Sequence, residues 1–128
     1  MAKGDDLMER LIGFGVLVLG TSTTLPKTTA GRHIADQLMR SATSAAPNYA
    51  EARSGESLRD FVHKLGIVRK ELHESYVWLR MLKQAGMGKA DQVEVLLKVC
   101  DELCRIISAS KKTAEMRLKE EQVGLSKF

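Results

Sequence analysis

The stretch "LRDFVHKLGIVRKELHESYVWLRML", residues 58–82, decides the fold class. Its apolar residues recur in alternating steps of three and four, a spacing that places them on one face of an α-helix. Ser57, with Asp60 three residues later, resembles a capping box, and the turn "AGMGKAD" at 85–91 ends the helix. The sequence therefore predicts a long amphipathic helix over about 57–85. Its core-facing row is Leu58, Phe61, Leu65, Val68, Leu72, Ser75, Leu79 and Leu82.

Outside this stretch, three more segments follow helical spacing, at about 5–21, 30–53 and 90–121. Asp5 or Asp6 is expected to cap the first of them. That segment is apolar nearly all round, so we expect it to be buried on more than one side, best by a subunit contact. The last segment turns polar after Ile107, so its final turns are expected to be solvated. Short connections between the segments predict one domain, an all-α, up-down-up-down antiparallel four-helix bundle.

The second helix is unusually thin, because every residue from Ser41 to Ala46 is small. Small side chains let a helix lie close to its neighbours, so we expect a close contact at Ala42 and Ala45. Pro47 should bend the helix there, and Asn48 can satisfy a backbone group near the bend. The alternative is a functional site at the bend, built from Arg40, Asn48, Tyr49 and Glu51.

Charge is uneven along the chain. The net charge is +4, yet residues 27–89 hold eleven Lys or Arg against six Asp or Glu. A local basic excess favours an acidic partner, such as nucleic acid or an acidic protein surface.

A second row lies beside the apolar one on the 57–85 helix. It contains cations and histidines but no acid, and it consists of Arg59, His63, Gly66, Lys70, His73, Val77 and Arg80. Lys64, Arg69 and Lys83 flank it, and the further basic candidates are Lys27, Arg32 and Arg40. The row predicts a surface that binds nucleic-acid backbone through Arg59, Lys64, Arg69, Lys70 and Arg80. The alternative is that these cations pair with nearby glutamates or with acids of another subunit.

Signals for catalysis, metals or cofactors are missing, so we expect a non-enzymatic protein without them. The histidines are not at metal-ligand spacing, and "GMGK" lacks the strand and spacing of a phosphate-binding loop. Cys100 and Cys104 are expected to be small buried side chains in a reducing cytoplasm. The apolar run "LIGFGVLVLG" is too short to span a bilayer, and no signal peptide is visible, so we expect a cytoplasmic location without a membrane.

An ordered set of motifs resembles the four-helix bundle protein family, also called the 23S ribosomal RNA intervening-sequence protein family. The matching points are Pro26-Lys27, Gly31, "QLMRSATS" from Gln37, "NYAEA" from Asn48, "DFVHKLGI" from Asp60, Lys70-Glu71 and "YVWL" from Tyr76. The resemblance implies a small bacterial protein, often encoded within an insertion in the large ribosomal RNA gene, and a homopentamer with a central opening. It also implies kinship with the accessory variability protein of diversity-generating retroelements, which binds a reverse transcriptase and nucleic acid.

Two functions are therefore expected. The first is an oligomeric scaffold, most simply a ring-like pentamer, that binds structured RNA through its basic surface. The alternative is a protein-interaction adaptor that docks an acidic partner, such as a reverse transcriptase, without touching nucleic acid.

Overall fold

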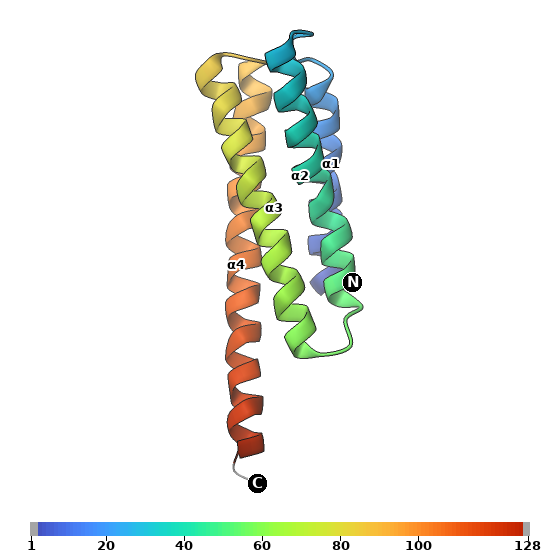
Figure 1. Ribbon diagram of the computed structural model, residues 1–128, viewed down its shortest axis with the longest axis vertical. Coiled ribbons are helices and arrows are strands. Elements are labelled where there is room, and N and C mark those ends of the chain that lie inside the picture. Colours follow the sequence, from blue (N-terminus) through green and yellow to red (C-terminus); the bar gives the residue numbers. More distant parts are fainter. Residues whose placement is uncertain (1–2, 127–128) are drawn as a thin grey trace.

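The computed structural model describes residues 3–126, and within them it contains four α-helices. They are α1 (Lys3–Ser22), α2 (Thr29–Arg53), α3 (Leu58–Ala85) and α4 (Ala90–Ser126). Consecutive helices pack together and run in opposite directions, as Figure 1 shows. The predicted all-α, up-down-up-down four-helix bundle is confirmed. The main difference lies in α4, which continues past the predicted end at 121 to Ser126.

Side-chain caps fix the starts of α2 and α3. The Thr28 hydroxyl accepts a hydrogen bond from the Gly31 N–H at 3.1 Å, and the Ser57 hydroxyl accepts one from the Asp60 N–H at 3.1 Å. Each bond satisfies one of the backbone donors that a helix start leaves free. The predicted cap at Ser57 is confirmed, and Thr28 is the cap of α2.

The other predicted helix start is wrong. Because α1 already includes Lys3, Asp5 and Asp6 lie in its first turn rather than at its cap. Their carboxylates still face the positive end of the helix dipole. The end of α3 follows the expected turn, where Gly86 adopts a left-handed conformation with φ of 68°.

The core consists of the apolar rows that the spacing predicted. In α3 the row is buried from Leu65 to Leu82, and its Leu58 end is half-buried. The rows of the other helices are buried too, and the largest side chains without exposed surface are Leu11, Phe14, Val18, Leu38, Leu96, Leu103 and Ile107. Burying these side chains is the main force that holds the bundle together.

The thin part of α2 lies at a close helix contact, as the small residues indicated. Ser41, Ala42 and Ala45 have no exposed surface. A methyl group on Gly15 of α1 would lie 3.7 Å from the Ala42 backbone oxygen, so the two backbones nearly touch. On the opposite side, the Ser41 and Ser75 hydroxyls are 2.8 Å apart and join α2 to α3. Small side chains therefore let α2 pack closely against both neighbours.

Candidate nucleic-acid interface

The predicted basic row lies on the outer side of α3. Arg59, Lys70 and Arg80 are exposed, and so are His63 and His73. Within residues 3–126, none of the three cations forms an ion pair. The alternative in which these cations are neutralised within the chain therefore fails for all three.

The flanking cations differ from one another. Arg69 is exposed and has no ion-pair partner in the described part of the chain. Lys64, in contrast, pairs with Glu51 of α2 at 2.9 Å. Because its charge is compensated, Lys64 is a weaker candidate than the sequence indicated.

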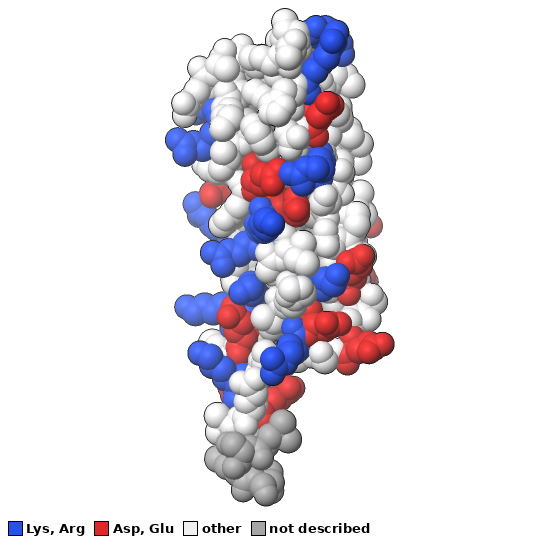
Figure 2. All heavy atoms as spheres, in the orientation of Figure 1, with Lys and Arg blue, Asp and Glu red and all other residues white. Residues whose placement is uncertain are grey.

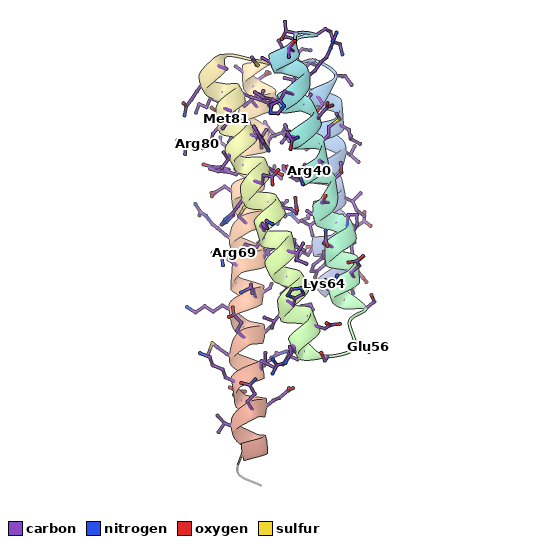
Figure 3. The ribbon with its side chains drawn as sticks, viewed as in Figure 1. Arg40, Glu56, Lys64, Arg69, Arg80 and Met81 are labelled. Atoms are coloured by element: carbon purple, nitrogen blue, oxygen red, sulfur yellow. The ribbon has the colours of Figure 1, made fainter. Side chains whose placement is uncertain are left out.

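Arg40 belongs to a polar clasp between α2 and α3. Its guanidinium is 3.4 Å from a carboxylate oxygen of Glu71 and also pairs with Glu74. The Trp78 indole N–H donates to the same Glu74 carboxylate at 3.2 Å, and His33 meets the Trp78 ring edge to face at 5.9 Å. Arg40 therefore fastens two helices together and lies apart from the α3 row, as the labels in Figure 3 show.

The last two basic candidates lie elsewhere on the bundle. Lys27 is in the connection between α1 and α2, and Arg32 is in the first turn of α2; both are exposed. Arg59 lies in the first turn of α3, at the opposite end of the bundle. Lys27 and Arg32 are thus separate from the lower half of the α3 row.

The alternative site around Pro47 of α2 is not assembled. Arg40 pairs with Glu74 in the polar clasp, and Glu51 pairs with Lys64. Asn48 donates its side-chain N–H to the Ser44 carbonyl at 2.8 Å, as expected near a proline, and Tyr49 is buried in the core. Four residues on one short segment thus point to four different surroundings.

A second row of cations, which the sequence analysis missed, follows the outer side of α4. This α4 row consists of Lys98, Arg105, Lys112 and Lys119, spaced seven residues apart and all exposed. Seven residues are close to two helical turns, so the four share one face. The spacing itself was the signal that could have revealed them. Arg105 pairs with Asp101 at 2.8 Å, whereas the other three form no ion pair among the described residues.

The two rows are neighbours. Glu94 lies four residues before Lys98, on the same side of α4, and pairs with Lys83 of α3 at 2.6 Å. Figure 2 shows the result: blue side chains follow one another down the left edge of the molecule, the edge where Figure 3 labels Arg80 and Arg69. The described residues thus carry an extended basic face over α3 and α4.

The cysteines lie beneath this face and are not part of it. Cys100 has no exposed surface, and its thiol donates to the Leu72 carbonyl at 3.2 Å. A hydrogen bond with Cys104, together with burial, raises the pKa of the Cys100 thiol. That bond lowers the pKa of Cys104, and the positive charge of Arg69 acts in the same direction. Among residues 3–126, no cluster of three or more His, Cys, Asp or Glu could hold a metal ion.

A different surface lies between α1 and α4. The α1 side chains Ile12, Val16, Leu17 and Leu19 are 42%, 60%, 48% and 46% exposed, so the expected burial on more than one side does not occur within one chain. Val16 and Leu17 line a groove of about 400 Å³ whose other wall is α4. No described helix is both long enough and apolar enough to cross a membrane.

The sequence and the fold are similar to those of known proteins. The model of the 23S rRNA-intervening sequence protein family matches residues 6–109. A crystal structure of a protein of unknown function from the S23 ribosomal protein family of Bacteroides thetaiotaomicron is similar, with a TM-score of 0.79 and 25% sequence identity; the match covers 87% of this chain and 99% of that one. No curated protein matches the sequence. Since the family model spans most of the bundle, the chain belongs to the 23S rRNA-intervening sequence protein family.

Proposed function

We propose that this protein is a non-enzymatic, ring-forming scaffold that binds structured RNA through its phosphate backbone. The observation that carries the proposal is a set of exposed cations on α3 without ion-pair partners in the described residues: Arg59, Arg69, Lys70 and Arg80. Such cations are free to replace the counterions of phosphates, which drives most non-specific binding to nucleic acid. The family name refers to an intervening sequence of 23S rRNA and assigns no ligand, so the choice of RNA belongs to the proposal.

Binding to the backbone rather than to bases is favoured by the aromatic residues. Among the described residues no Phe, Tyr or Trp side chain is exposed: Phe61, Tyr76 and Trp78 are half-buried and the others are buried. Unpaired bases are usually held by stacking on exposed aromatic rings. A surface with cations and without exposed Phe, Tyr or Trp rings suits phosphates, whose positions carry no base identity.

The assembly part of the proposal rests on the apolar surface between α1 and α4. Large apolar side chains are grouped there, and contiguous exposed apolar surface usually marks an interaction site. Gln92, which lines the groove, has a buried side-chain oxygen without a hydrogen-bond partner, and so has Ser22 at the end of α1. A second copy of the chain would cover the apolar side chains. Five subunits follow from the family resemblance.

A cytoplasmic location completes the proposal. Both cysteines are free, which is usual in a reducing compartment. RNA would be accessible to the protein in that compartment.

The test is a filter-binding series on structured RNA at several salt concentrations. The wild type is compared with the Arg59→Glu/Lys70→Glu/Arg80→Glu variant. The matched control is Lys27→Glu/Arg32→Glu/Lys89→Glu, which changes the net charge equally at exposed, unpaired positions away from the lower α3 row. Each lost phosphate contact should reduce the slope of log affinity against log salt by about 0.7–0.9, so we expect the α3 variant to lose about 2–3 in slope and the control to lose little.

Two results would refute the proposal. The first is equal affinity of the α3 variant and the wild type, provided that the variant stays folded. The second is absence of binding by the wild type at low salt. In either case the adaptor function, in which the basic face docks an acidic protein, would replace RNA binding.

A further inference from the structure

The α4 row has properties that the α3 row lacks. Its four cations occupy one helix at a constant spacing of seven residues, about 10.5 Å at 1.5 Å per residue. From Lys98 to Lys119 the row extends over about 31 Å and drifts around the helix by about 20° at each step of seven residues. Helix α4 has 37 residues, against 28 in α3, and Figure 1 shows its last part projecting past the connection between α2 and α3.

The projecting part of α4 does not serve the core. Ala114 is the last buried residue, and every described side chain after it is exposed or half-buried. The family match ends at residue 109, so Lys112 and Lys119 lie beyond it. A solvent-exposed helix end that continues a row of cations extends the basic face without adding to the fold.

We infer that the α4 row is the second half of the nucleic-acid face, and that the α3 and α4 cations together take a double-stranded RNA. This inference rests on the proposed function. Packed helices lie about 8–10 Å apart, so the outer sides of α3 and α4 form two adjacent lines of positive charge. A duplex offers two phosphate strands on a stiff, straight frame. Positive charges fixed along a straight helix therefore suit a duplex.

A single strand fits this face less well. It is flexible, so holding it along about 31 Å of helix costs conformational entropy. Proteins usually offset this cost by stacking bases on aromatic rings, and no Phe, Tyr or Trp ring is exposed in the described part of the chain. The duplex needs no such compensation, because its bases are already stacked.

The α4 cations are also available. Lys98, Lys112 and Lys119 are exposed without ion pairs among residues 3–126, and only Arg105 shares its charge with an acid. Lys111 is not part of the row and lies between α4 and α3. A methyl group on Gly66 of α3 would be 3.3 Å from the Lys111 Cε. The Lys111 ammonium pairs with Glu115. The face thus keeps three free positive charges on α4 beside those on α3.

The test compares five proteins on one duplex RNA of about 20 base pairs and on one of its strands alone. They are the wild type, the α3 variant Arg59→Glu/Lys70→Glu/Arg80→Glu, the α4 variant Lys98→Glu/Lys112→Glu/Lys119→Glu, Lys119→Glu alone, and the charge-matched control Lys27→Glu/Arg32→Glu/Lys89→Glu. The α4 variant should stay folded, because all three side chains point to solvent; circular dichroism checks this. Lys119→Glu alone, beyond the last buried residue, provides a second variant that cannot disturb the core.

We expect the wild type to bind the duplex at least about tenfold more tightly than the single strand. The α4 variant should lose about 2–3 in salt slope on the duplex, and Lys119→Glu about one, while the control keeps the wild-type slope. If the α4 variants bind the duplex as the wild type does, while the α3 variant fails, the inference is wrong and the proposed function stands. Equal wild-type affinity for duplex and single strand would overturn the choice of ligand. Absence of binding to either RNA would refute the proposed function itself.

Discussion

The start of α2 offers a sharp test of the packing, because it depends on one missing methyl group. A methyl group on Gly31 would lie 2.1 Å from the Pro26 backbone oxygen, whereas such contacts essentially never fall below 3.0 Å. In Gly31→Ala the connection between α1 and α2 must therefore move by about 0.9 Å or more. That movement also pulls on the 3.1 Å cap bond between the Gly31 N–H and the Thr28 hydroxyl.

The magnitude follows from three contributions. Forcing a methyl group into a filled space costs about 1–3 kcal/mol, and loss of the cap bond costs about 1 kcal/mol more. Alanine returns about 1 kcal/mol through its higher helix propensity. The net loss in the free energy of unfolding is thus about 1–3 kcal/mol, which for a chain of this size lowers the melting temperature by about 4–12 °C.

The assay is thermal unfolding followed by circular dichroism, with Gly13→Ala as the matched control. Gly13 lies inside α1 with nothing within 4 Å of its would-be methyl group, so there the same substitution should raise stability by up to about 1 kcal/mol. The two variants should shift the melting temperature in opposite directions. Melting of Gly31→Ala at or above the wild-type temperature would refute the close approach of Gly31 to Pro26.

Three further predictions concern packing, assembly and pH. Ala45→Leu, at a fully buried site, should lose about 1–3 kcal/mol of stability while exposed Ala50→Leu changes little; equal melting temperatures would contradict the close contact. Light scattering should give the wild type a mass near five chains of 14.2 kDa, and Val16→Glu should reduce it; a wild-type mass of one chain would defeat the ring. Burial raises the pKa of Tyr49, so above about pH 10 the unfolded chain ionises first and stability falls with rising pH. In urea titrations above about pH 10, Tyr49→Phe should lose less stability with rising pH than the wild type does. An unchanged pH profile in this variant would show that Tyr49 is not the cause of the loss.

The fold could be predicted from the sequence because its signals are local. The row from Leu65 to Leu82 repeats over several turns, and each turn independently indicates which side of α3 is buried. The end of α4 could not be placed in the same way. After Ala114 no described side chain of α4 is fully buried, and this part of the helix contains residues of high helix propensity such as Arg117, Leu118 and Lys119.

The candidate site was only half predictable, because charge pairing depends on how helices are rotated against one another. Lys64 and Arg40 find their acids 13 and 31 residues away on another helix, and no pattern within one helix fixes those distances. A count of charges per segment does not reveal the α4 row. Residues 90–128 hold seven cations and seven acids, so their net charge is zero, yet Lys98 and Lys112 share one side of the helix. A sum over a segment cannot show that cations recur along one side of a helix.

The proposed ring assembly and the proposed RNA binding use different residues of α4. Its Val95, 53% exposed, lines the groove with α1, whereas its Glu94 pairs with α3 on the other flank, next to the α4 row. A neighbouring subunit seated between α1 and α4 would therefore leave the α3 row uncovered. In a ring, the basic face would recur once per subunit, and linked binding faces raise affinity without any new contact. A chain with a net charge of only +4 could then hold RNA firmly, because the assembly would bring several copies of its basic face together.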